Sequence, residues 1–358
     1  MTASTCFRPR VRRGWARCVV AALLAAAALS AGAATRASAA THDVYVANLR
    51  GSSISVVDPT TNTVVATVPV GSYPVGVAVT PDYSQAWVVN EGSNDVSVIS
   101  TATNTVTATI PLSGLPDAIA LSPDGTTAYV TFTYLKYSSA VYVIDTSTDT
   151  VTTVIPVGFD ASSIAVTPDG SRVYVANLVS NSVSVIDATT NTVITTISGS
   201  RMDTPTDIAI SPDGTRAYVA DFNSGNVFVI DTATNAITAV IPTGPGPESL
   251  SLSPDGTQAY VANANADDVA VIDTATNTVT ATIPAGSEPV GVLMSGTAAF
   301  VADAGTNTVA VIDTATNTVT ATTPVGNTPF AMAQAPVFQP PAGTAVSRTA
   351  ASSPAAPR

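Results

Sequence analysis

The chain has 358 residues, of which 46% are hydrophobic and only 11% are charged, and its formal net charge is −12. This composition is too apolar for a disordered chain, so we expect a packed core. Negative charge without a basic cluster beyond the first 40 residues argues against nucleic-acid binding, because phosphate backbones would be repelled.

Residues 1–39 have the layout of a secretory signal peptide. Five arginines between positions 8 and 17 precede an alanine-rich apolar run at 18–29, and Ala37-Ser38-Ala39 is a small-residue cleavage site. The apolar run is shorter than the ~20 residues of a membrane span. We therefore predict export by the general or the twin-arginine route, cleavage after Ala39, and a mature protein in the extracellular space or cell envelope without a membrane span.

Cleavage would also change the chemistry of the chain. Both cysteines, Cys6 and Cys18, lie in the predicted signal peptide, so we expect no disulfide and no thiolate site in the mature protein. Six of the 13 basic residues would leave with the signal peptide and all 25 acidic residues would remain, which gives a net charge of −18.

The rest of the chain repeats one unit. The segment VIDTATNTVTATIP at 271–284 has close copies whose aspartate recurs every 40 to 45 residues, a spacing typical of repeat folds. In the unit at 247–286, alternating apolar and polar residues predict four strands. Pro254-Asp255-Gly256 predicts a turn between the first two strands.

Four short antiparallel strands per unit predict an all-β fold, a β-propeller. First strands begin near residues 74, 116, 161, 205, 247, 289 and 329, which gives seven blades. The mature chain starts with a second strand, so we expect a split blade in which the C-terminal strand joins the three N-terminal strands. We predict the propeller at 40–336 and a disordered, Pro/Ala/Ser-rich tail at 337–358.

The second strand of each unit supplies one aromatic residue. A ring at one fixed position in every repeat is most simply packed between neighbouring blades. These residues are Tyr45, Trp87, Tyr129, Tyr174, Tyr218, Tyr260 and Phe300.

The repeats, such as RVYVAN and SNSVSVIDATTNTVITTI within 172–197, resemble the YVTN family of β-propeller repeats. The resemblance extends over roughly residues 43–335. It implies a secreted or surface protein of the bacterial or archaeal type. The broader relatives include lactonases and lyases, so the shared fold does not fix an activity.

Few residues offer catalytic chemistry. The one histidine, His42, lies close to the predicted mature terminus, where we expect it to be solvated. Without further histidines or cysteines, zinc, copper and iron lack their usual ligands. The sequence contains no Gly-x-Ser-x-Gly elbow and no phosphate-binding P-loop. Carboxylates remain for acid–base chemistry or for hard cations.

Many of the carboxylates have a structural explanation. We expect the aspartates of the Pro-Asp turns and of the repeated segment to cap backbone amides. Asp117, Asp207 and Glu248 lie near the start of innermost strands and could point into the channel mouth. They are candidate ligands for Ca²⁺ or Mg²⁺, which prefer several oxygen ligands. The alternative is an acidic face that only keeps the protein soluble.

Departures from the repeat are candidate binding sites. The longest loop between second and third strands carries Tyr134, Lys136 and Tyr137, and an unusual joint between blades carries Arg201 and Asp203. Exposed aromatic residues beside charges suit stacking on a sugar or contact with a protein. The alternative is a loop tip that folds on its own side chains.

Three hypotheses follow. In the first, the protein is a monomeric, non-catalytic propeller without a cofactor that binds a cell-wall polymer, a carbohydrate or a surface protein through an acidic loop face. In the second, it is a lactonase-like hydrolase or a lyase that uses channel-mouth carboxylates and a divalent cation. In the third, it is a structural component of the envelope. Convergence of Asp117, Asp207 and Glu248 within about 5 Å would favour the cation site.

Overall fold

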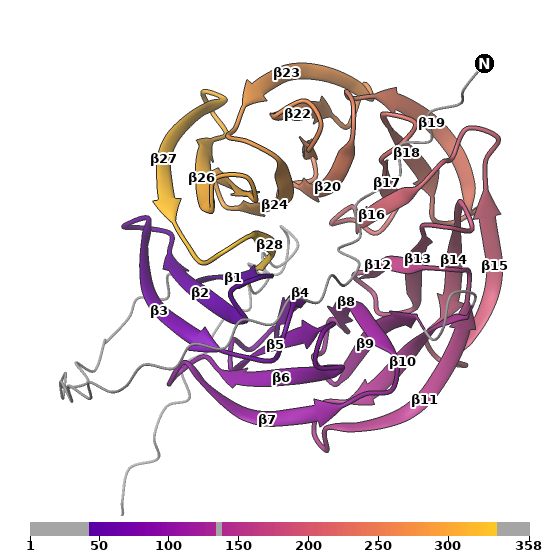
Figure 1. Cartoon of the computed structure of the whole chain (residues 1–358). Helices are drawn as coiled ribbons and strands as arrows, with labels where there is room; N and C mark the ends of the chain where they lie inside the picture. Colours follow the sequence, from indigo (N-terminus) through magenta and orange to yellow (C-terminus); the bar gives the residue numbers. More distant parts are fainter. Residues whose placement is uncertain (1–42, 134–137, 335–358) are drawn as a thin grey trace, which may run out of the picture. The chain divides into compact units, whose positions relative to one another are not determined.

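The repeat unit forms a four-stranded antiparallel sheet in the computed structural model of the protein, which describes residues 43–133 and 138–334. Seven such sheets, the blades, surround one centre, so the predicted seven-bladed β-propeller is confirmed (Figure 1). The innermost strands lie next to the centre in Figure 1, and the outermost strands run along the rim.

The inner half of each blade consists of two strands. The innermost strands are β4 (Pro74–Val79), β8 (Leu115–Leu121), β12 (Ala161–Val166), β16 (Pro205–Ile210), β20 (Pro247–Leu252), β24 (Pro289–Ser295) and β28 (Pro329–Ala333). The second strands are β1 (Val44–Asn48), β5 (Gln85–Asn90), β9 (Thr127–Thr133), β13 (Arg172–Asn177), β17 (Arg216–Asp221), β21 (Gln258–Asn263) and β25 (Ala298–Asp303).

The outer half of each blade consists of two further strands. The third strands are β2 (Ser53–Asp58), β6 (Asp95–Ser100), β10 (Ser139–Asp145), β14 (Ser182–Asp187), β18 (Asn226–Asp231), β22 (Asp268–Asp273) and β26 (Thr308–Asp313). The outermost strands are β3 (Thr63–Pro69), β7 (Thr105–Pro111), β11 (Thr150–Val157), β15 (Thr192–Ser198), β19 (Ala236–Pro242), β23 (Thr278–Pro284) and β27 (Thr318–Pro324).

One blade contains both the first and the last strand. Its strand order is β28-β1-β2-β3, and β28 pairs antiparallel with β1, so that Tyr45 lies opposite Ala333 and Asn48 opposite Pro329. The split blade predicted from the sequence is therefore confirmed. The pairing hydrogen-bonds the inner edge of β1, which would otherwise stay open.

The aromatic residue of each second strand is buried, as the sequence predicts. The seven rings are at most 4% exposed. Trp87, for example, lies in one cluster with Val96 of its own blade and with Val130 and Tyr142 of the next blade. A buried aromatic side chain removes roughly 150–250 Å² from water, so these rings are a main source of core stability.

Several of the tyrosines also hydrogen-bond across the boundary between blades. Tyr174 Oη donates to Asn235 Oδ1 at 2.8 Å, and Tyr260 Oη donates to Asn317 Oδ1 at 2.8 Å. Both asparagines lie in the turn between the third and outermost strands of the next blade, with φ angles of 55° and 54°. Asparagine tolerates this left-handed conformation better than most residues do. The turn and the ring therefore hold each other in place.

Successive connections open on opposite faces of the ring, because the strands are antiparallel. We call the face with the turns between innermost and second strands, and between third and outermost strands, the turn face. The opposite face, the loop face, carries the loops between second and third strands and the joints between blades. Backbone hydrogen bonds tie loop to joint within a blade, for example from Glu91 N to Tyr73 O at 2.9 Å.

We expect Trp87→Ala to lower the free energy of unfolding by about 3–5 kcal/mol, because it removes a fully buried ring between two blades. Tyr174→Phe keeps the ring and removes only the hydroxyl group, with its hydrogen bond to Asn235 Oδ1 and its longer one to Thr232 O, so it should cost about 1 kcal/mol. Urea unfolding of both variants measures the difference. Equal losses would show that the buried ring does not dominate the contact between blades.

Candidate functional site

Asp207 lies near the start of β16, one of the innermost strands, and joins three of these strands. Its Oδ1 accepts hydrogen bonds from Ser163 Oγ on β12 at 2.7 Å and from Ile208 N at 2.8 Å. Its Oδ2 accepts one from Leu250 N on β20 at 2.9 Å. Burial among these strands raises the pKa of Asp207, and the hydrogen bonds offset part of that rise. A buried carboxylate with a raised pKa is a candidate for proton transfer.

The other polar residues of the innermost strands make similar ties. Ser162 Oγ donates to Pro205 O and Thr206 Oγ1 donates to Pro247 O, both at 3.0 Å. Each bond runs from one blade to the next. These side chains therefore hold the inner wall of the ring together.

The structure does not group the three predicted cation ligands into a metal site. Asp117 and Glu248 each directly follow the first proline of their innermost strand, the place that Thr206 takes after Pro205. Asp207 is one residue further along its strand. Across residues 43–133 and 138–334, no three Asp, Glu, His or Cys side chains are placed to hold a metal ion. Binding of Ca²⁺ or Mg²⁺ therefore stays a prediction from the sequence, without geometric support.

The predicted partner-binding residues fall into two groups. Tyr134, Lys136 and Tyr137 lie outside the described residues. Arg201 and Asp203 are exposed on the loop face, in the joint that precedes β16. Asp203 N donates to Asp221 Oδ2 at 2.8 Å, so this joint is held against the loop that follows β17.

Sequence reasoning missed a row of exposed apolar side chains on the loop face. Tyr73 is 46% exposed, Leu115 46%, Phe159 43% and Val179 56%. We call these four residues the apolar row. The first three lie at the joints leading into β4, β8 and β12, which belong to three consecutive blades.

The apolar row departs from the repeat at positions where the other blades have small or polar residues. Directly before the innermost strand, Tyr73 stands where other joints have Thr204, Gly246, Glu288 or Thr328. Its φ is 53°, a left-handed conformation that glycine adopts without steric cost, as Gly246 does in the equivalent place at 74°. A large side chain at a joint where the fold accepts a small one was therefore the sequence signal that could have identified the apolar row.

Neighbouring contacts fix the apolar row in place. A Cβ added to Gly92 would come within 2.4 Å of the Tyr73 ring, so the ring lies against that glycine. Phe159 N donates to Ser180 Oγ at 2.6 Å, and Val179 N donates to Phe159 O at 3.2 Å. Phe159 and Val179 thus lie side by side in one blade.

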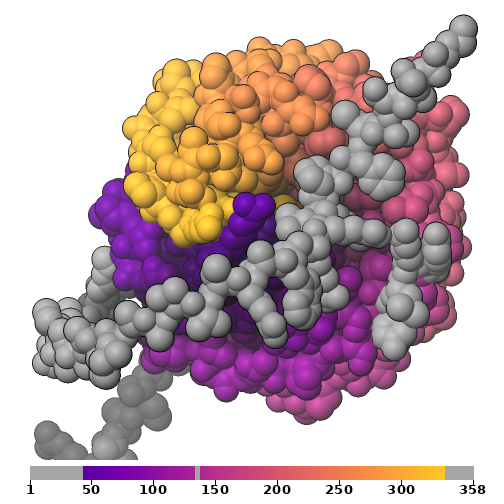
Figure 2. Space-filling model, viewed as in Figure 1, coloured from indigo at the N-terminus to yellow at the C-terminus, as the bar shows by residue number. Residues whose placement is uncertain are grey.

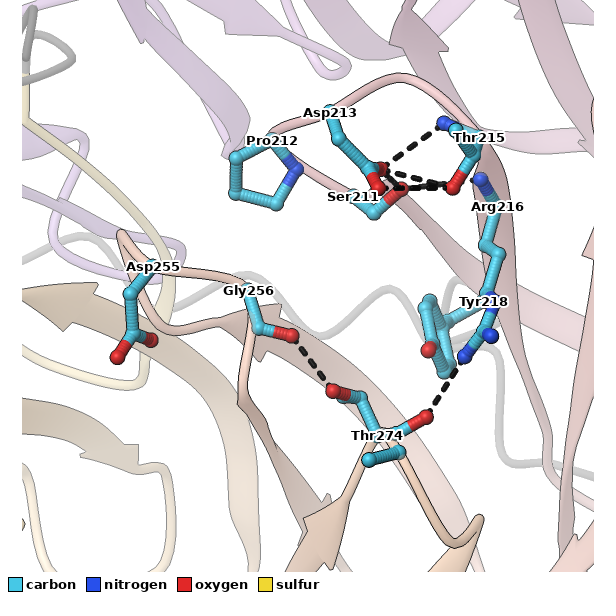
Figure 3. Close-up of a pocket in the computed structure, with 10 residues that line it drawn as sticks. Ser211, Pro212, Asp213, Thr215, Arg216, Tyr218, Asp255, Gly256 and Thr274 are labelled. Carbon is cyan, nitrogen blue, oxygen red and sulfur yellow. Dashed lines mark hydrogen bonds between the residues drawn. The ribbon is translucent and has the colours of Figure 1, made fainter. Parts of the chain in front are cut away.

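The turn face has two small cavities between blades. One has a volume of about 210 Å³ and is lined by Asp213, Arg216 and Asp255 among others (Figure 3). The other has about 180 Å³ and lies around Arg172. Arg216 Nη1 donates to Thr274 O at 2.7 Å, which uses the guanidinium to join two blades. Both cavities are smaller than the ~300–1,000 Å³ usual for ligand pockets, so we do not assign them a ligand.

The repeated aspartates of the turn face cap their own turns. Asp273 Oδ1 accepts from Thr276 N and Thr276 Oγ1, each at 2.8 Å. Asp255 Oδ1 accepts from Ser253 Oγ at 2.6 Å and from Thr257 N at 3.1 Å. Hydrogen bonds lower the pKa of both carboxyl groups. Their capping role, expected from the sequence, is confirmed.

Two buried aspartates stand at the end of a second strand, where four other blades have asparagine. Asp221 accepts hydrogen bonds from Asp203 N and Ser224 N, and burial raises its pKa to about 6. Asp303 is 1% exposed, and its Oδ1 has no hydrogen-bond partner within the described protein. Burial raises the pKa of Asp303 to about 7.

We expect Asp303→Asn to stabilise the protein, and more at pH 8 than at pH 5. The folded pKa of about 7 lies above the ordinary value of 3.8, so ionising Asp303 disfavours the folded state as pH rises from 3.8 to 7. The gain in unfolding free energy at pH 8 should be roughly 2–4 kcal/mol. Thermal and urea unfolding at both pH values measure it.

Asp221→Asn is the matched control for this substitution. Its carboxylate accepts two backbone N–H groups, and an amide nitrogen cannot accept either of them. It should therefore give no comparable gain. A gain for Asp303→Asn that is equal at both pH values would contradict the ionisation argument.

The fold has relatives among solved structures. A chain of Kuenenia stuttgartiensis hydrazine synthase is 25% identical, covers 76% of this chain and 93% of its own length, and superposes with a TM-score of 0.71. A protein of unknown function from Desulfotomaculum acetoxidans is 17% identical, covers 82% and 98%, and has a TM-score of 0.70, which shows the fold alone. No curated protein sequence matches the chain. Within the described residues, no helix is long and apolar enough to cross a membrane.

A match to a family model assigns the chain to a protein family, whereas these solved structures show its fold. The model described as "Lactonase, 7-bladed beta-propeller" matches residues 43–243, more than half of the 358 residues. The family model does not name the YVTN repeats, so that narrower resemblance stays a prediction. The chain belongs to the seven-bladed β-propeller lactonase family.

Proposed function

We propose that the mature protein is a non-catalytic binding protein that holds a polypeptide partner on its loop face. The observation that carries the proposal is the apolar row, Tyr73, Leu115, Phe159 and Val179, exposed on three consecutive blades. All other exposed large hydrophobic side chains of the described residues lie on the outermost strands. Among the described residues, the apolar row is therefore the one place on the loop face where large apolar side chains are this exposed.

The fold does not account for these side chains. Buried aromatic rings and hydrogen bonds between the innermost strands hold the ring together. The joints into β16, β20, β24 and β28 connect their blades in the same way with small or polar residues at these positions. Tyr73 adopts a left-handed backbone, as Asp160, Thr204, Glu288 and Thr328 do at the equivalent joints, so the fold requires this conformation but not a large side chain there. A large side chain kept at such a position supports a role in binding.

The composition of the apolar row favours a protein over a sugar as partner. Sugars stack on flat aromatic rings, whereas Leu115 and Val179 are branched and aliphatic and suit the apolar centre of a protein interface. Glu91, Asp95 and Asp160 lie on the same face, which favours a partner with basic side chains. The proposed partner is thus a polypeptide that presents apolar and basic residues, in the cell envelope or outside the cell.

Photo-crosslinking tests this proposal. A photoreactive residue placed at Leu115 or Phe159 in the exported protein should capture one polypeptide partner, and the same residue at Ala102, exposed on the turn face, should not. The double substitution Tyr73→Gly and Phe159→Asp should reduce capture at Leu115 at least about tenfold while the melting temperature stays close to the wild-type value. Capture should also weaken as NaCl is added, because the charge contribution is screened.

Two outcomes would contradict binding at the loop face. One is capture at Ala102 as efficient as at Leu115. The other is capture at Leu115 that the double substitution leaves unchanged.

Family membership favours a second candidate function, the hydrolysis of a lactone in the central channel. Asp207 would be its general base, since its pKa is raised and it lies on an innermost strand. If a lactone is hydrolysed, Asp207→Asn should lower kcat by about 10²–10⁴-fold, the range typical of a lost acid–base group. Glu248→Gln is the control on the neighbouring strand β20.

A panel of lactones, followed by pH-stat titration, measures this activity. In the wild-type protein the rate should rise with pH through the raised pKa of Asp207, because only the ionised carboxylate accepts a proton. A wild-type protein that hydrolyses none of the lactones, or an Asp207→Asn variant with full activity, would remove this candidate.

A further inference from the structure

The rim of the propeller differs in charge from both of its faces. The seven outermost strands, β3, β7, β11, β15, β19, β23 and β27, contain no Asp, Glu, Lys or Arg. Every charged residue that the structure describes therefore lies off these strands, in a chain with 25 acidic residues. The charge of the described residues is therefore segregated by position, because none of it lies on the outermost strands at the outer margin of the ring, which Figure 2 shows from one face.

The rim is also the most apolar part of the exposed surface. Eight of the twelve exposed large hydrophobic side chains in the described residues lie on the outermost strands, with Val154 at 49% and Ile194 at 48% exposure. The remaining outward positions are mostly threonines, as at Thr278, Thr280 and Thr282 in β23. The exposed apolar side chains gather on β11 and β15, which carry two each, and an uncharged patch of this kind is a candidate interaction site.

The backbone edges of the outermost strands are protected against strand pairing. Each outermost strand contains a bulge opposite its third strand, such as the register shift between Val271 and Ile272. In β23, Thr280 Oγ1 donates to Val271 O at 3.3 Å and so fixes this bulge. Most of the strands also contain a proline near their end. Bulges and prolines block pairing with another strand, so the rim offers its side chains and not its backbone.

We propose that copies of this chain associate side by side through the rim. The two faces carry the negative charge of the protein, so stacking of face on face is repelled, while rim against rim brings no charges together. Four of the eight exposed apolar side chains of the rim, Val151, Val154, Val193 and Ile194, lie on β11 and β15 of neighbouring blades, so two copies related by a two-fold axis can bring this patch against itself. Valine and threonine lose little rotamer freedom on packing, which lowers the cost of ordering the interface.

This association is independent of the loop-face partner and has the opposite response to salt. Added NaCl screens repulsion between acidic copies, so it should strengthen contact at the rim, whereas it should weaken binding of a basic partner. From the sequence alone we expect a monomer. The repeat pattern does not show that the outward positions of the outermost strands stay exposed around the ring, so it does not identify the rim as an interface.

Sedimentation velocity of the exported protein, over a range of concentrations and NaCl, tests the proposal. The wild type should form dimers or larger species as concentration and salt rise. Val154→Lys combined with Ile194→Lys should raise the dissociation constant at least about tenfold, because it places charges on β11 and β15. Val179→Lys, at an equally exposed position of the loop face, is the matched control and should leave association unchanged.

A milder variant guards against loss of folding. Ile194→Thr introduces the residue that β7 has in the equivalent place, Thr107, so the strand should stay intact while apolar area is lost. It should weaken association less than the lysine variant does. A wild type that stays monomeric at all concentrations, association that falls as salt rises, or equal weakening by Val179→Lys would each overturn the proposal.

Discussion

The packing of one aromatic ring between each pair of blades is the constraint on which the rest of the structure depends. A four-stranded sheet of this size cannot bury both of its faces, and it becomes stable only when a neighbour covers each face. The rings supply that cover at one position per repeat, and they are at most 4% exposed. Tyr174 and Tyr260 add hydrogen bonds to left-handed asparagines of the following blade, so ring and turn are specified together. Closure by β28 extends the same packing to the ends of the ring.

This constraint separates positions that build the ring from positions that are free to vary. Capping aspartates, the hydroxyl groups of innermost strands and the second-strand asparagines all bond to their own or the next blade. Asp303 shows the effect of a carboxylate at such a position. Its Oδ1 has no hydrogen-bond partner, as is also true of the asparagines in the other blades, and burial raises its pKa to about 7. Asp221 also stands where other blades have asparagine, but it accepts hydrogen bonds from Asp203 N and Ser224 N, and its pKa rises less.

The sequence predicts the architecture well, because local signals repeat. Seven copies of one strand pattern identify the blades, and an incomplete unit at each end identifies the split blade. The candidate sites could not be predicted with the same success. Whether Asp117, Asp207 and Glu248 meet depends on register around the ring, which the strand pattern does not specify. Tyr73 and Phe159 look like ordinary apolar residues, and only the folded joint shows that they stay exposed.

Asp207 illustrates why membership in a lactonase-type family leaves the activity open. Its Oδ1 uses both lone pairs on Ser163 and Ile208, and its Oδ2 uses one on Leu250. The carboxylate therefore joins β12, β16 and β20 whether or not a substrate enters the channel. The Ser249 side chain is a further hydrogen-bond partner of Asp207, so a general base in this position would have to exchange one of these bonds for a substrate proton while holding three strands. The side chains of the apolar row are exposed, and other blades have small or polar residues in their places, and this difference is why we place the function of the protein on the loop face.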